Sequence, residues 1–178
     1  YLIDFVWTHG HWRYATEAET PAQISVQDST GTEKMLERLA PDEARRTLRV
    51  WLAPDGNCDD QFKFMVNVAT EWGEHIRTGH LPRHLVWESM HTTILRTLLY
   101  PLPATTLSQK QCHQIMAPRL KDGLPCAGIV RTMPRDLVHG PQWYHRLGIP
   151  DLFLEQAIQH INKLVKFGQS QTITGKLL

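Results

Sequence analysis

Cysteines are few in this sequence, and their spacing fits neither of their common structural uses. Cys58, Cys112 and Cys126 are the only three among 178 residues, and no two form a CxxC pair. Secreted disulfide scaffolds pair cysteines in even numbers, and structural zinc sites use closely spaced pairs. The pattern therefore excludes both and favours a reducing, intracellular setting.

Long apolar runs are also missing. None approaches the roughly 20 residues of a membrane-spanning helix, and no basic leader with a cleavage site opens the chain. We expect no membrane partner and an intracellular location, with nucleus and cytoplasm both open. The chain starts at Tyr1 inside an apolar run without a methionine, which is typical of a sequence cut within a domain.

Charge of one sign is not in excess. Nineteen Lys and Arg face eighteen Asp and Glu, for a formal net charge of +1. Any basic surface for nucleic acid must therefore be local. No glycine-rich loop of the kind that cradles phosphates is present.

Short β-branched and aromatic runs broken by turn residues predict strands in the first 53 residues. The expected strands are Tyr1–Trp7, His11–Tyr14, Ile24–Gln27, Glu33–Leu39 and Arg45–Ala53. Together they predict a small antiparallel sheet.

Helical periodicity replaces this pattern from Asn57, the expected N-cap of a helix that extends to Gly79. Further helices are expected at Leu81–Tyr100, Ser108–Leu120 and Asp151–Phe167. Pro82 suits a first helical turn, Ser108 is the expected cap of its helix, and Pro118 should shorten or kink that helix. Residues 121–150 should form turns and short pieces. The prediction is an α+β protein with a sheet region at 1–56, a helical region at 57–168 and a frayed tail at 169–178.

Possible catalytic groups have simpler interpretations. Asp59-Asp60 resembles a metal-binding pair, but it stands at a helix start, where acidic residues favour the macrodipole. The histidine pairs lack a third ligand, and the neighbours Cys112 and His113 point in different directions on a helix. We predict no catalytic residue and no metal site.

Two basic clusters are more informative, because such clusters can hold phosphates. One contains Arg77, His80, Arg83 and His84, and the other contains Arg131, Arg135, His139 and Arg146. The alternative is that each arginine is a solvated surface charge. Trp72, Trp87 and Trp143 are expected to be core anchors rather than stacking platforms.

Three stretches in order carry a resemblance: Tyr1 to Phe5, Arg46 to Asn57, and Tyr100 to Leu107. With Gly140-Pro141 and Leu147 to Pro150, they resemble reverse transcriptases of non-long-terminal-repeat retrotransposons, over about residues 1 to 168. The resemblance implies the end of the palm with a primer-grip strand, followed by a helical thumb.

That family's catalytic aspartates, which bind magnesium, would precede Tyr1, so the fragment is expected to be inactive alone. It would need the remainder of the polymerase chain. Its partners would be an RNA template and a DNA primer. The residues expected to contact them are Thr47, Leu48, Val50, Arg77, Arg83, Arg131 and Arg135.

Two other readings stay open. One is a helical protein-interaction module whose arginines are only surface charge and which has no affinity for nucleic acid. The other is an independently expressed, catalytically dead protein that retained nucleic-acid binding.

Two departures from the family pattern lead to a stability prediction. Arg49 and Arg146 stand where the family has glycine. If those glycines provide positive φ or a close backbone approach, an arginine costs roughly 1 kcal/mol or more. In a decayed element copy, reverting both to glycine should raise the thermal midpoint, and no rise would contradict that hypothesis.

Overall fold

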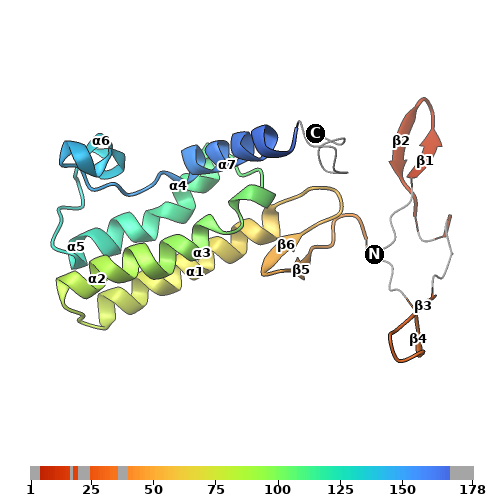
Figure 1. Ribbon diagram of the computed structural model, residues 1–178, viewed down its shortest axis with the longest axis horizontal. Coiled ribbons are helices and arrows are strands. Elements are labelled where there is room, and N and C mark those ends of the chain that lie inside the picture. Colours follow the sequence, from red (N-terminus) through yellow and green to blue (C-terminus); the bar gives the residue numbers. More distant parts are fainter. Residues whose placement is uncertain (1–4, 17, 20–24, 36–39, 169–178) are drawn as a thin grey trace. The chain divides into compact units, whose positions relative to one another are not determined.

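The computed structural model describes residues 5–16, 18–19, 25–35 and 40–168 (Figure 1). Two compact units divide the chain, Tyr1–Asn57 and Cys58–Leu178. Antiparallel strands form the first unit and helices dominate the second, so the protein is α+β, as predicted. The expected tail at 169–178, and parts of the expected strands at 1–4, 24 and 36–39, lie outside the described residues.

The described strands form three two-stranded ladders instead of the single sheet predicted. The pairs are β1 (Phe5–Thr8) with β2 (His11–Tyr14), β3 (Ser25–Gln27) with β4 (Glu33–Met35), and β5 (Arg45–Thr47) with β6 (Val50–Leu52). Each strand is only three or four residues long and pairs with its neighbour in sequence. No described strand joins two pairs.

Aromatic side chains hold the β1–β2 ladder. Phe5 lies opposite Tyr14 and Trp7 opposite Trp12 in the register, and each pair has ring centroids 5.1 Å apart. Cross-strand aromatic pairs of this kind are a main source of stability in short hairpins.

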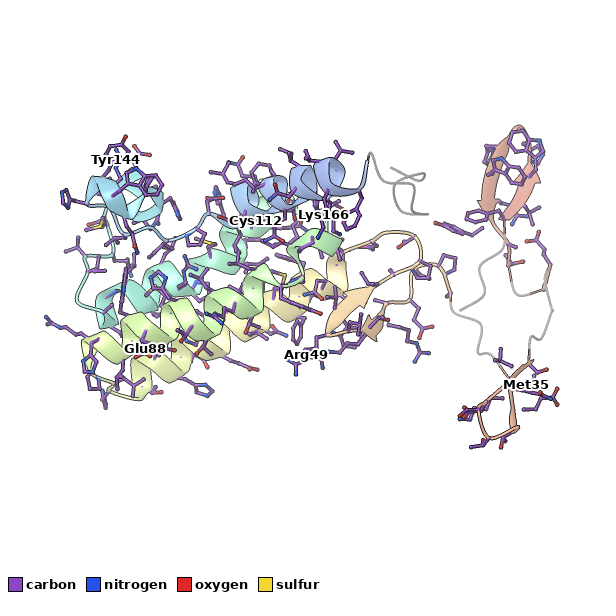
Figure 2. The ribbon with its side chains drawn as sticks, in the orientation of Figure 1. Met35, Arg49, Glu88, Cys112, Tyr144 and Lys166 are labelled. Atoms are coloured by element: carbon purple, nitrogen blue, oxygen red, sulfur yellow. The ribbon has the colours of Figure 1, made fainter. Side chains whose placement is uncertain are left out.

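The β5–β6 hairpin corrects the prediction of one strand over Arg45–Ala53. Thr47 and Val50 face each other across the ladder, and the chain reverses at Leu48 and Arg49, whose φ angles are 49° and 69°. Positive φ at both turn residues defines a type I′ turn, which normally selects Asn-Gly. Because Leu48-Arg49 is not Asn-Gly, the sequence gives no turn signal here, and the apolar alternation across Leu48, Val50 and Leu52 predicted one continuous strand. Figure 2 labels Arg49.

Helix α1 (Asp59–Thr78) opens the helical unit. Its N-cap is Cys58 rather than the predicted Asn57, because the Asn57 N–H donates to Asp55 Oδ1 at 2.8 Å and so belongs to the preceding turn. The predicted apolar stripe is the buried one. It comprises Met65, Ala69, Trp72, Gly73 and Ile76, with Phe62 and Val66 partly buried.

The predicted helix at Leu81–Tyr100 is a continuous rod with a wide turn inside it. It consists of α2 (Arg83–Ser89), the π-helical η1 (Met90–Ile94) and α3 (Leu95–Leu99). Pro82 occupies the N-cap position, one residue before the predicted first turn. After Pro101 the chain continues as the 3₁₀ turn η2 (Leu102–Ala104).

The next rod extends further than predicted. In α4 (Gln109–Pro118), Ser108 caps the N-terminus as expected, with a capping box to Gln111. Pro118 does not end the rod, which continues through the π-helical η3 (Arg119–Gly123) into α5 (Leu124–Cys126). A proline removes one helical hydrogen bond, and the wider π turn accommodates that loss.

Short elements fill 127–151, as predicted, and a final helix follows. They are α6 (Arg135–His139) and the 3₁₀ turn η4 (Gln142–Tyr144), so the prediction of short pieces over 121–150 holds from 127 and is wrong for 121–126, which continue the preceding rod. Helix α7 (Leu152–Phe167) follows, and Asp151 caps it through the N–H groups of Phe153 and Leu154. Trp143 is 77% exposed, which corrects its expected role as a core anchor.

The central core contact joins three elements of this unit. The Trp72 ring of α1 lies against Gly123 of η3, where an added Cβ would sit 2.9 Å from the indole. The indole N–H donates to Ser89 Oγ of α2 at 3.0 Å. The main buried cluster lies wholly within this unit.

Of the two arginines that were expected to be strained, only one has a strained backbone. Arg49 has positive φ, whereas Arg146 does not. The Arg146 stem lies against Gly140, and its Nη1 donates to the Asp136 carbonyl at 3.3 Å.

Replacing Leu48-Arg49 by Asn-Gly should therefore stabilise the β5–β6 hairpin by about 1 to 2 kcal/mol, because both residues lose the left-handed penalty. Slower amide hydrogen exchange across Arg45 to Leu52 measures this gain. Arg146→Gly should instead lower the free energy of unfolding by about 1 kcal/mol, which thermal unfolding measures as a lower midpoint. Arg146→Met, which keeps the stem, is the matched control, and a stabilised Arg146→Gly would contradict the expectation.

Candidate nucleic-acid interface

The outward face of α4 and η3 carries polar and basic side chains at helical spacing. The residues are Lys110, His113, Gln114, Ala117 and Lys121, with successive spacings of three, one, three and four that keep all five on one side of the helix, and all are exposed. The opposite face of the same rod supplies Cys112, Ile115 and Met116 to the core. The division follows from the 3.6-residue helical period.

Three adjoining hollows lie along this face, and Ala117 lines all of them. The first has a volume of about 590 Å³ and is lined by His113, Met116, Ala117, Leu120, Lys121, Arg131, Arg135, His139 and Asp151. The second is about 430 Å³, with Lys110 and His113 in its wall. The third is about 580 Å³, with Arg77, Lys121, Glu74 and Asp122.

The first hollow is positively charged. Lys121, Arg131 and Arg135 face one carboxylate, Asp151, and none of the three cations makes an ion pair with a described residue. Asp151 Oδ1 is already engaged as the cap of α7. Such a hollow can take an anion that bonds to several cations at once.

Backbone bonds position the α6 wall of this hollow. Leu147 N–H donates to Leu137 O at 2.9 Å, and Ile149 N–H donates to Val138 O at 3.0 Å. Val138 and Ile149 are fully buried, and the His139 ring is fixed by a 2.8 Å bond between Nδ1 and the Ile149 carbonyl. Arg135 and His139 therefore project from a short helix anchored on the core.

The structure brings together only some of the residues predicted to bind nucleic acid. Arg131 and Arg135 share the first hollow, and Arg77 lines the third. Arg83 lines none of the three, and its side chain lies instead against Gly128, 3.0 Å from an added Cβ. Thr47, Leu48 and Val50 belong to the other unit, with Leu48 81% exposed and Val50 buried.

Sequence reasoning missed Lys110, His113 and Lys121. The signal was present for Lys110 and His113, which fall on one face of the predicted helix Ser108–Leu120, whereas Lys121 lies one residue beyond its predicted end. They were overlooked because they are spread through the helix rather than clustered in sequence.

A further arginine, Arg119, lies buried beside this face. Arg119 is completely inaccessible, and its Nε, Nη1 and Nη2 have no hydrogen-bond partner in the described structure. Burial lowers the pKa of Arg119 to about 10, and the charge of Asp151 acts in the opposite direction. The pKa of His91 is lowered by burial and, secondly, by the charge of Arg119.

Chemistry elsewhere in the described residues is limited. No three His, Cys, Asp or Glu side chains there gather as metal ligands. Asp59 and Asp60 occupy the first turn of α1, where Asp60 pairs with Lys63 at 3.2 Å. Burial raises the pKa of Cys112 to about 11, so its thiol stays protonated at neutral pH. Figure 2 labels Cys112 on α4.

None of the described helices is long and apolar enough to cross a bilayer.

No protein-family model, curated protein or solved structure matches the chain.

Replacing Arg119 by methionine should raise the stability of the protein. Methionine keeps a long apolar side chain at this position and removes a buried, unpaired charge. The change is expected to increase the free energy of unfolding by about 1 to 3 kcal/mol. Thermal unfolding measures the gain as a higher midpoint. Arg96→Met on the exposed side of α3 is the control and should change little. A lower midpoint for Arg119→Met would show that water or a ligand satisfies the guanidinium.

Proposed function

We propose that the helical unit binds the backbone of an RNA·DNA primer–template duplex, as the thumb region of a non-long-terminal-repeat reverse transcriptase. The observation that carries the proposal is the basic row of Lys110, His113 and Lys121 on the outward face of α4 and η3, with hollows beside these side chains. The order of sequence segments that resemble this family supports it.

The dimensions of the row suit a nucleic-acid strand. Lys110 and Lys121 are eleven residues apart on a nearly continuous rod, which corresponds to roughly 16 Å along its axis. One strand of a duplex places a phosphate about every 3.4 Å of helix axis, so the row spans roughly five phosphates. Arg131 and Arg135 widen the positive surface on one side, and Arg77 widens it on the other.

Contacts of this kind position a duplex without reading its sequence. Lysine and arginine bind phosphate oxygens whatever the bases are, and the resemblance assigns the chain a gripping role rather than a chemical one. The proposal places the magnesium-binding aspartates in the remainder of the polymerase chain. No residue described here is assigned a catalytic role.

Fluorescence anisotropy with a labelled RNA·DNA hybrid tests the proposal on the full chain. Affinity should fall steeply with salt, because each phosphate contact releases counterions. The double variant Arg131→Gln/Arg135→Gln should weaken binding and reduce the slope of log K against log salt by about 2. Its matched control, Arg83→Gln/Arg96→Gln, removes the same charge from positions outside the three hollows and should have a smaller effect.

Two results would count against the proposal. Absence of binding at low salt would favour the protein-interaction reading of the chain. An equal loss in the two double variants would show a diffuse attraction that does not depend on the α4 face.

A further inference from the structure

Helix α7 exposes an apolar stripe. Leu154, Ile158, Ile161 and Val165 are 60%, 48%, 59% and 73% exposed. They are spaced four, three and four residues apart, so they lie in one line along the helix. A contiguous exposed apolar row is the usual mark of an interface rather than of a free surface.

The opposite face of α7 is fixed to the body by polar groups. The Gln156 amide accepts from Leu107 N–H at 2.9 Å and donates to Leu107 O at 3.0 Å. His160 Nε2 bonds to Leu102 O at 3.1 Å, and Lys163 Nζ donates to Pro103 O at 2.6 Å. Rotating the helix to bury the stripe would break these bonds, so the apolar row is held on the outside.

We propose that this stripe pairs with the same stripe of a second copy of the chain, with the two α7 helices antiparallel. The 4-3-4 spacing is that of a coiled-coil seam, with β-branched Ile158 and Val165 at one core position and Leu154 and Ile161 at the other. A two-fold axis midway between Ile158 and Ile161 brings Leu154 of each copy opposite Val165 of the other.

Two charged side chains beside the stripe favour a second copy of the chain as the partner, and they favour the antiparallel orientation. Glu155 and Lys166 flank the stripe on the same side of the helix, and neither makes an ion pair with a described residue. Antiparallel pairing brings like flanks together, so Glu155 of each copy lies beside Lys166 of the other, twice in the dimer. A parallel pair would place Glu155 beside the flank of Ala157 and Leu164. The antiparallel arrangement also opposes the helix macrodipoles. Figure 2 labels Lys166 near the end of α7.

The contact is small for a permanent dimer. One stripe of about two heptads on each copy falls below the area of a standard interface, so association should be weak and concentration-dependent. Sedimentation equilibrium of the full chain over increasing concentration should show the mass rising from that of one chain toward twice that value. The mass of one chain at all concentrations would overturn the proposal.

A charge in the middle of the stripe should abolish association. Ile161→Glu places a carboxylate at the axis of the dimer and should leave a monomer with an unchanged circular dichroism spectrum, because the side chain is exposed. Val130→Glu is the matched control, since Val130 is 63% exposed and lies outside the helix. Association that survives Ile161→Glu would overturn the proposal.

A charge exchange tests the orientation. Glu155→Lys and Lys166→Glu should each weaken association several-fold, because each creates two like-charge contacts. The double variant Glu155→Lys/Lys166→Glu should restore it. Association unaffected by the single changes would overturn the antiparallel pairing.

Discussion

The helical unit depends on the contact between Trp72 and Gly123. The indole fills the space that a side chain at 123 would need, and its N–H donates to Ser89 Oγ of α2. One side chain therefore fixes the approach of α1, α2 and η3. Gly123 lies in the π turn η3 that follows Pro118, so this wide turn lies where the rod of α4, η3 and α5 packs against the Trp72 ring. Close packing leaves little room for alternatives, because protein interiors are as dense as organic crystals.

The basic surface follows from that packing. Once the apolar side of the third rod faces α1, its other side must point outward with Lys110, His113 and Lys121. The segment after α5 then folds back, and the buried pair Val138 and Ile149 holds Arg135 and His139 over the rod. Cations far apart in sequence share one hollow for this reason. The unpaired Arg119 beneath them shows that the core itself tolerates positive charge at this end.

Helix α7 shows that amphipathicity does not by itself say which side of a helix is buried. Its apolar positions predict a helix correctly, and the usual inference would turn those positions inward. The structure does the reverse, because Gln156, His160 and Lys163 bind backbone groups of 102–107, among which the N–H and carbonyl of Leu107 are buried. A buried carbonyl or N–H without a partner costs more than an exposed leucine.

The sequence alone determined the α+β class, the positions of the four main helical stretches and the cap at Ser108, because these depend on side chains within a few residues of one another. Tertiary structure decided the rest. It placed Arg131 and Arg135 together but Arg83 apart, gave α7 its outward apolar face, and closed the β5–β6 hairpin over Leu48 and Arg49 without the usual turn residues. These outcomes depend on contacts between segments distant in the chain, or on a strained turn imposed by strand pairing, and no local pattern encodes either.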